Sequence, residues 1–124
     1  MGKLLLSTLP EDDIAARLPR GEWESFTGST LTTPAALKKD LKKIRDRGYA
    51  VDDNERSVGL RCVAAGIEID GRVTAAISLS GPAAEFTPAR QKEYAAELHG
   101  LASRLADDPD FVVAIGSLAT SLRP

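Results

Sequence analysis

The chain has 124 residues, the length of one domain, and 43% hydrophobic residues are enough to build one core. Its net charge of −2 excludes the basic excess that is typical of a free-standing nucleic-acid-binding protein. Its single cysteine excludes an internal disulfide, and no apolar run approaches the roughly 20 residues that cross a bilayer. We therefore expect a cytoplasmic protein that makes no contact with a membrane.

The first part of the chain predicts helices. Gly2 to Leu18 is typical of two helical pieces, the second beginning at Pro10 with acidic residues that suit the positive end of the helix dipole. A longer helix is expected from Thr33-Pro34, because a hydroxyl at the N-cap and a proline at the first helical position favour a helix start. Gly48 is expected to end it.

The connection between these helices is irregular and contains two aromatic residues, Trp23 and Phe26. Aromatic side chains usually pack rather than bind ligands, so we expect both rings to hold the connection onto the core.

Three strands are expected next, over Tyr49–Asp53, Val58–Ile69 and Arg72–Ser80, with a turn at Asp70-Gly71 between the last two. Thr87-Pro88 then begins another helix, which is expected to end near residues 107–109. The order of these elements predicts an α+β fold with an antiparallel sheet and flanking helices.

Two registers are open for the Asp70-Gly71 hairpin. With a two-residue loop, Ile69 pairs with Arg72, and Cys62 points to the face opposite the serines at 78 and 80. With a three-residue loop and a glycine bulge, Glu68 pairs with Arg72 instead, and Cys62 then lies directly across from Ser78.

Four small polar residues form the candidate ligand site: Asp52, Cys62, Ser78 and Ser80. The three-residue loop would gather them on one side of the sheet. A thiol, two hydroxyls and a carboxylate gathered in this way could suit a small polar ligand.

An enzymatic alternative takes Cys62 as nucleophile, His99 as base and Asp52 as the orienting acid. A mid-strand cysteine lacks the helix N-terminus that would stabilise a thiolate, so we expect no catalytic residues. One cysteine and one histidine lack the ligand spacing of a metal site, and no phosphate-binding glycine loop is present. We therefore expect neither a metal nor a cofactor.

Three strings in the middle of the chain resemble the effector-binding domain of the IclR family of bacterial transcriptional regulators. They are residues 47–52 (RGYAVD), 58–65 (VGLRCVAA) and 75–82 (AAISLSGP). Residues 86–90 (FTPAR) and the opening GKLL are also similar to that family.

The resemblance implies a GAF-like or profilin-like domain that senses a small organic acid, in a regulator that forms homodimers or homotetramers. It implies that Asp52, Cys62, Ser78 and Ser80 contact the ligand. It also implies that DNA is bound only through an N-terminal winged helix-turn-helix, which this chain lacks, and that the first strands of the domain are missing. Residues 1–106 are expected to form the partial effector-binding domain, and residues 107–124 a divergent tail.

Two details differ from the family pattern. The turn before Arg72 is one residue short, and Gly66 stands where the family has proline. A different function stays open: a domain that only joins subunits, in which the four polar residues are ordinary small residues of a sheet.

Overall fold

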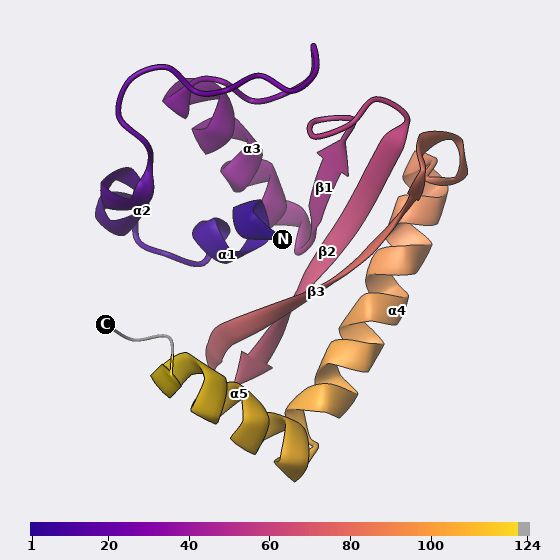
Figure 1. Ribbon diagram of the computed structural model, residues 1–124. Coiled ribbons are helices and arrows are strands. Elements are labelled where there is room, and N and C mark those ends of the chain that lie inside the picture. The colour runs from indigo at the N-terminus through magenta and orange to yellow at the C-terminus, as the bar shows by residue number, and fades with distance from the viewer. Residues whose placement is uncertain (122–124) are drawn as a thin grey trace.

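The computed structural model describes residues 1–121, with side chains up to residue 118. The elements follow the order α1 (Gly2–Ser7), α2 (Glu11–Arg17), α3 (Pro34–Arg47), β1 (Ala50–Asp53), β2 (Leu60–Ile69), β3 (Arg72–Pro82), η1 (Ala83–Glu85), α4 (Pro88–Ala106) and α5 (Pro109–Ser121). Figure 1 shows the three strands crossing the middle of the molecule, with α1 to α3 on one side and α4 on the other. The expected α+β fold with an antiparallel sheet and flanking helices is confirmed.

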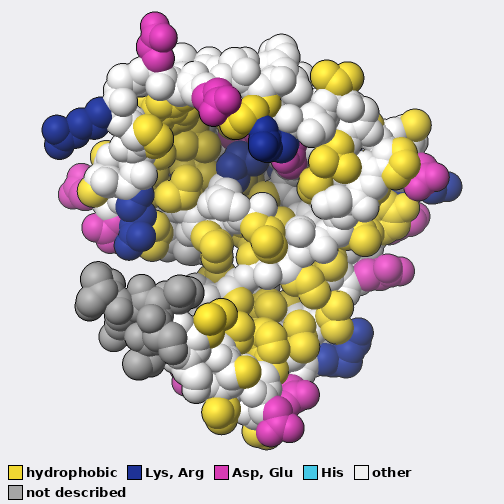
Figure 2. Space-filling model, viewed as in Figure 1, with side chains coloured by type: hydrophobic (Ala, Val, Ile, Leu, Met, Phe, Trp, Pro, Cys, Tyr) yellow, Lys and Arg dark blue, Asp and Glu magenta, His cyan; other side chains and the backbone are white. Residues whose placement is uncertain are grey.

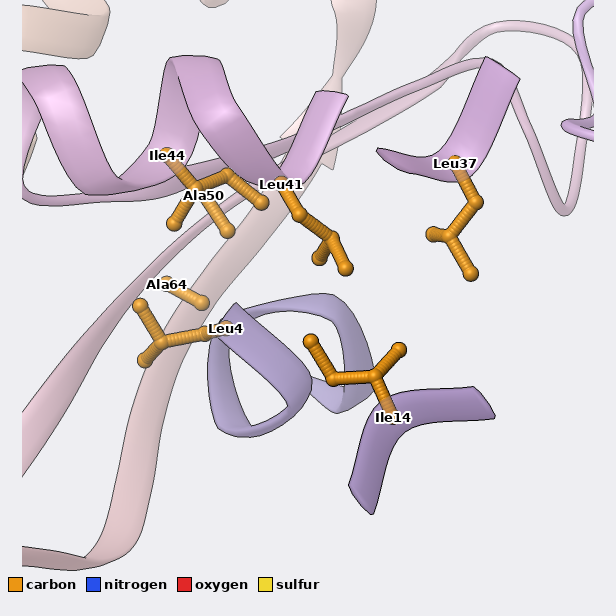
Figure 3. Packing of buried hydrophobic residues seen from close by; sticks show 7 residues of the cluster. All are labelled: Leu4, Ile14, Leu37, Leu41, Ile44, Ala50 and Ala64. Atoms are coloured by element: carbon orange, nitrogen blue, oxygen red, sulfur yellow. The ribbon is translucent and has the colours of Figure 1, made fainter. Parts of the chain in front are cut away.

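The sheet has the strand order β1-β2-β3, and each pair is antiparallel. Side chains alternate between its two faces, so β2 contributes to two separate core clusters. Ala64 packs with α1 to α3, whereas its neighbours Val63 and Ala65 pack with α4. The first cluster consists of Leu4, Ile14, Leu37, Leu41, Ile44, Ala50 and Ala64 (Figure 3).

The helix ends follow the sequence signals. The hydroxyl oxygens of Thr33 and Thr87 accept hydrogen bonds from the backbone N–H groups of Ala36 and Arg90, at 3.2 and 3.3 Å. Gly48 ends α3 in the left-handed conformation, with φ of 88°, which a glycine adopts without a steric penalty. These predicted boundaries are confirmed.

The β2–β3 hairpin combines features of both expected registers. Its loop has two residues, because Ile69 pairs with Arg72, and the positive φ values of Asp70 and Gly71 (52° and 76°) are those of a type I′ turn. The alternative register, a three-residue loop with Glu68 paired to Arg72, is therefore not the one that the chain adopts. The consequence expected from the two-residue loop was also wrong, because a bulge follows the turn.

The bulge restores the same-face arrangement. Glu68 pairs with Val73 and Ile67 pairs with Ala75, so Thr74 is an additional residue in β3. Beyond this bulge, Cys62 pairs with Ser80 and Ala64 pairs with Ser78. The predicted pairing of Cys62 with Ser78 is therefore wrong by two residues. Because side chains alternate between faces, a shift of two residues leaves both serines on the same face of the sheet as Cys62.

The aromatic residues of the irregular connection behave differently from each other. Trp23 packs against the first core cluster, as expected. Phe26 is 47% exposed and lies under the guanidinium of Arg56, which is 3.8 Å from the ring centroid. The expectation that Phe26 packs onto the core was therefore wrong, because a cation–π contact on the surface satisfies the ring instead.

The tail after Pro109, which the sequence leaves without an assigned structure, forms α5 up to Ser121, and residues 122–124 lie outside the described part. α5 packs mainly on α4, and Val113 and Leu118 on it are exposed. Figure 2 shows hydrophobic side chains gathered over this end of the molecule.

Candidate functional site

Three of the four predicted ligand residues form one cross-strand row. Asp52 of β1 pairs with Cys62 of β2, and Cys62 pairs with Ser80 of β3. Directly paired side chains in an antiparallel sheet have Cβ atoms about 5 Å apart and share a face. The sheet therefore brings a carboxylate, a thiol and a hydroxyl together in sequence-distant strands.

Ser78 lies in the next row on the same face, opposite Ala64. Ala64 is buried against α1 and α3, so the second row marks the boundary of the helical layer. Ser78 and Ser80 are exposed, while Cys62 and Asp52 are half-buried. The quartet is thus accessible from the β3 side and enclosed from the β1 side.

A hydrogen bond already joins two members of the row. The hydroxyl of Ser80 donates to the sulfur of Cys62 across 3.0 Å. Sulfur is a weak acceptor, so a ligand oxygen would be a better partner for the same hydroxyl. The row therefore offers a donor whose present partner is readily exchanged.

Asp52 has a structural task in addition. Its Oδ1 accepts a hydrogen bond from the backbone N–H of Glu55 at 3.0 Å, which fixes the turn after β1. A carboxylate repels an anionic ligand group, so Asp52 suits a hydroxyl or N–H donor on a ligand better than a carboxylate.

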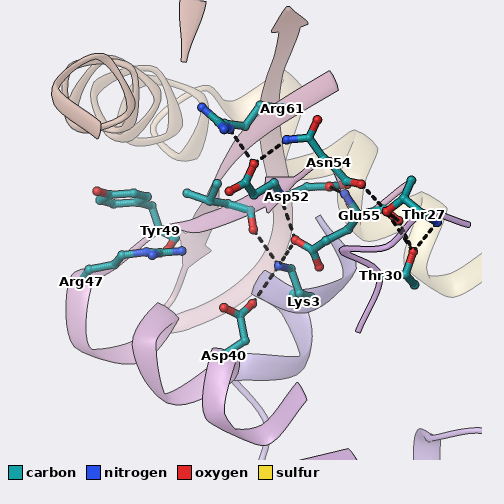
Figure 4. A network of polar contacts seen from close by, with 12 residues as sticks. Lys3, Thr27, Thr30, Asp40, Arg47, Tyr49, Asp52, Asn54, Glu55 and Arg61 are labelled. Carbon is teal, nitrogen blue, oxygen red and sulfur yellow. Dashed lines mark hydrogen bonds and ion pairs between the residues drawn. The ribbon is translucent and has the colours of Figure 1, made fainter. Parts of the chain in front are cut away.

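Behind Asp52 lies a polar network built around Lys3 (Figure 4). The ammonium of Lys3 donates to Asp40 Oδ2 at 2.7 Å, to Glu55 Oε2 at 2.7 Å and to the carbonyl of Val51 at 2.6 Å. Each of the three charged side chains is about one fifth exposed. Lys3 therefore ties α1 to α3, to β1 and to Glu55 in the turn after β1.

The position of Lys3 at the centre of this network was not predicted from the sequence. The available signal was a single charged residue, placed at the beginning of an apolar run at residues 4–6. A charge in that position on a short helix is either exposed or paired with residues distant in sequence, and only the fold distinguishes the two.

The irregular connection before α3 also supports this turn. The hydroxyls of Thr27 and Thr30 donate to the backbone carbonyls of Asn54 and Glu55 (Figure 4). The segment therefore covers the β1 end of the site, and its two threonines satisfy carbonyls that a turn leaves unpaired.

Asp53, the neighbour of Asp52, points to the other face and belongs to a separate pair. Its Oδ1 accepts from Arg61 Nε at 2.8 Å and from the amide of Asn54 at 2.6 Å. Partial burial raises the pKa of Asp53, but these hydrogen bonds and the positive charges of Arg61 and Lys3 outweigh burial and lower the pKa below its usual value.

The residues of the enzymatic alternative do not lie close together. His99 of α4 lines a cavity of about 170 Å³ with Gly66 and Glu68. Gly66 is four residues along β2 from Cys62, which is about 13 Å in a strand. His99 therefore lies too far from the thiol to act as its base. Among the described residues, no group of three or more potential ligands could hold a metal ion.

Comparison with known proteins identifies the domain type. The family model "Bacterial transcriptional regulator IclR C-terminal" matches residues 1–107. The HTH-type transcriptional regulator BhcR of Paracoccus denitrificans (strain Pd 1222) is 46% identical over 91 residues, which are 73% of this chain and 33% of BhcR. The chain thus spans about a third of the length of this relative.

Solved structures agree with this result. The IclR structure of Thermotoga maritima is 37% identical, with a TM-score of 0.77 over 86% of this chain and 43% of that one. The inducer-binding domain of PobR from Acinetobacter, a double mutant in complex with 3-hydroxybenzoic acid, has a TM-score of 0.75 over 85% of this chain and 61% of its own. At 20% identity, the PobR likeness concerns the fold alone. No helix of the described residues is long and apolar enough to cross a membrane.

Proposed function

Since this chain belongs to the IclR C-terminal family of bacterial transcriptional regulators, we propose that it senses a small organic acid and joins regulator subunits. The family is one of regulators, which confirms the expectation of a regulatory rather than an enzymatic domain. DNA would be bound through a helix-turn-helix domain outside this chain, and the regulator would act in the cytoplasm.

The cross-strand row of Asp52, Cys62 and Ser80, with Ser78 beside it, is the observation that carries the proposal. The hydroxyls of Ser78 and Ser80 would donate to a ligand carboxylate. Asp52 would accept from a hydroxyl or N–H group of the same ligand, because its own charge opposes a second anion. The ligand class is therefore a small acid that also carries a donor, such as a hydroxy acid.

Sensing requires a difference in affinity between two states. A ligand that binds one arrangement of subunits better shifts the population toward that arrangement and so changes the affinity of attached DNA-binding domains. Ser78 and Ser80 belong to β3, so movement of this strand would connect ligand binding to subunit arrangement.

A thermal-shift panel tests the proposal. Hydroxy acids, 2-oxo acids and 3-hydroxybenzoate are added to the chain at millimolar concentration, and a ligand at a hundred times its Kd stabilises by about 2.7 kcal/mol. Ser80→Ala and Cys62→Ala should remove the shift, whereas Ser57→Ala, in an exposed loop, should preserve it.

If no acid raises the Tm, or if the shift survives Ser80→Ala and Cys62→Ala, the sensing proposal fails. The chain would then be left with the second candidate function, in which it joins subunits without binding an effector. The hydrogen bond from the hydroxyl of Ser80 to the sulfur of Cys62 favours this candidate, because these two residues satisfy each other without a ligand.

A further inference from the structure

A recess of about 150 Å³ lies between α2 and α3. Its floor is formed by Ile14 of α2 and by Leu37 and Leu41 of α3, which are 8%, 7% and 1% exposed. Figure 3 shows the side chains of Ile14 and Leu37 pointing toward each other from the two helices. The lining comes from α2, from Leu18 just after it, and from α3, whereas the candidate ligand row lies on the three strands. The recess is therefore a separate site.

The sequence of α2 explains why the two helices leave space between them. Ile14 and Leu18 are one helical turn apart and both line the recess, but Ala15 beside them contributes only a methyl group. The remaining positions of this seven-residue helix are acidic, small or basic, and Ile14 is its one buried residue. A helix held mainly by one buried side chain leaves room that a longer side chain at position 15 would fill.

The inner surface of the recess is apolar. Ile14, Leu18, Leu37 and Leu41 present only hydrocarbon to it. A water molecule needs two or more polar partners, whereas cavities of about 150 Å³ that are lined by aliphatic side chains stay dry and bind molecules such as benzene. The part of a ligand that enters the recess must therefore be hydrocarbon, of the size of one six-membered ring or a short branched chain.

The rim of the recess carries one positive charge without a counter-charge. Lys38 and Arg45 both line it, about two helical turns apart on the same side of α3. Lys38 is paired with Glu11 of α2 at 3.5 Å. Arg45 has no carboxylate partner among the described residues, and its Nη1 donates to the carbonyl of Ser7 at 3.3 Å. A guanidinium has five N–H donors, so most of them stay available at the Arg45 end of the recess.

The apolar floor and the charged rim are close enough for one small molecule to contact both. Arg45 follows Leu41 by one helical turn, which is about 6 Å along α3. A ring that packs on Leu41 therefore places a carboxylate attached to it within reach of the guanidinium. A guanidinium and a carboxylate can form two parallel hydrogen bonds, which fix the orientation of the ligand as well as its charge.

We propose that the recess between α2 and α3 is a second ligand site, which binds a small monocarboxylic acid with an apolar body, such as an aromatic or branched-chain acid. The body lies between the two helices, and the carboxylate is bound by Arg45. This ligand class differs from that of the candidate ligand row, where Asp52 calls for a hydroxyl or N–H donor on the ligand. The second site therefore does not depend on the proposed effector site.

A ligand in the recess would hold α2 against α3. The irregular connection that follows α2 reaches the turn after β1, where the hydroxyls of Thr27 and Thr30 donate to the backbone carbonyls of Asn54 and Glu55. Local opening of a short helix with few buried contacts costs little free energy, and apolar contacts to both helices raise that cost. Occupancy should therefore slow amide hydrogen exchange in α2.

A nuclear magnetic resonance titration of the full chain tests the proposal, with benzoate as the probe and benzyl alcohol as its neutral analogue. Benzoate should shift the amide signals of residues 11–18 and 34–45, with a Kd on the order of 1 mM, as expected for so few atoms. Benzyl alcohol should bind about tenfold more weakly, because it lacks the charge that pairs with the guanidinium.

Two pairs of variants separate the apolar floor from the charged rim. Ala15→Leu should fill the recess and abolish both titrations, whereas Ala16→Leu, the same change at an exposed neighbour outside the lining, should preserve them. Arg45→Gln should weaken benzoate binding about tenfold and leave benzyl alcohol binding unchanged. Lys42→Gln removes a cation that is paired with Asp46 instead, so it should affect neither probe.

Several outcomes overturn the proposal. They are the absence of benzoate shifts in residues 11–18 and 34–45, benzoate binding that survives Ala15→Leu, and equal losses for both probes in Arg45→Gln. Circular dichroism controls for the folding of Ala15→Leu, and Arg45→Gln gives an answer even if that variant unfolds. Ser80→Ala should leave the benzoate shifts in α2 and α3 intact, so failure of the second site is distinguishable from failure of effector sensing.

Discussion

At the scale of single residues, Lys3 decides how the N-terminal helix is attached to the rest of the molecule. Its ammonium donates to Asp40 on α3, to the carbonyl of Val51 on β1 and to Glu55 in the following turn, so one side chain satisfies acceptors from three parts of the chain. The free energy lost on removing such a residue comes mainly from the partly buried groups that are left without a partner, and less from the hydrogen bonds themselves. Removal would leave Asp40 and Glu55 as two partly buried carboxylates without their common cation.

We expect Lys3→Met to destabilise the protein by about 2 kcal/mol, because breaking a partly buried ion network leaves charges uncompensated. Lys42→Met removes an exposed partner of Asp46 and should change stability by less than about 0.5 kcal/mol. Urea unfolding measures both. Adding Glu55→Gln to Lys3→Met should recover part of the loss; equal losses for Lys3→Met and Lys42→Met would contradict the assignment.

Asp53 gives a prediction about pH. Its pKa is lower in the folded state than in the unfolded chain, so its stabilising contribution is present above about pH 4 and is lost as the pH falls through the folded pKa. Asp53→Asn should therefore reduce the loss of stability between pH 5 and pH 3. The side chain is 60% exposed, so the effect will be small. The check is the urea midpoint across that range, with Glu24→Gln as control; an unchanged pH slope in Asp53→Asn would refute it.

At the scale of elements, the caps and the turns carry the local information. Helices begin after Thr33 and Thr87 and end at Gly48, as predicted. These boundaries were predictable because a cap depends only on neighbouring residues. The Asp70-Gly71 turn was located correctly for the same reason. Thr74 could not be found in this way, since a bulge depends on how two strands pack against two helical layers.

The candidate site follows the same division. That Cys62, Ser78, Ser80 and Asp52 lie on strands was predictable from local composition, and they do share one face. The direct partner of Cys62 was not predictable, because it depends on the bulge. Their role as ligand residues stays a prediction that the thermal-shift experiment decides.

We expect Gly48→Ala to destabilise the protein by about 1–2 kcal/mol, since the left-handed conformation brings a Cβ atom close to the following carbonyl. Gly28→Ala is the matched control, because the position has no positive φ and an added Cβ meets nothing within 4 Å. It should be neutral or slightly stabilising. Thermal denaturation compares the two, and similar Tm values for both variants would be evidence against the cap.

At the scale of the whole molecule, β2 is the element that joins both layers. Its alternate residues enter the cluster under α1 to α3 and the cluster under α4. Destabilisation of one cluster should therefore also lower the stability of the other. We expect one cooperative unfolding transition at a fixed protein concentration, with Trp23 fluorescence and far-UV circular dichroism changing together.

Leu98→Ala tests this coupling, because Leu98 is buried in the α4 cluster, while Trp23 packs on the opposite one. The substitution should cost about 2–4 kcal/mol and should lower the midpoint seen by Trp23 as much as that seen by circular dichroism. His99→Ala, at an exposed neighbouring position, should leave both midpoints nearly unchanged. Two separate midpoints in Leu98→Ala would show that the layers unfold independently.

The extra threonine in β3 also bears on how this hairpin can vary among related genes. Sulfur and hydroxyl emerge on one face when the loop residues and the bulge residue together number three, as in the two-residue loop with one bulge found here; the position of the surplus residue between them is immaterial. A one-residue deletion at the turn is harmless when an insertion a few positions away offsets it. Related domains should therefore have either a longer hairpin loop or a bulge in the strand. The length of the loop is for this reason a poor guide to how closely two such domains are related.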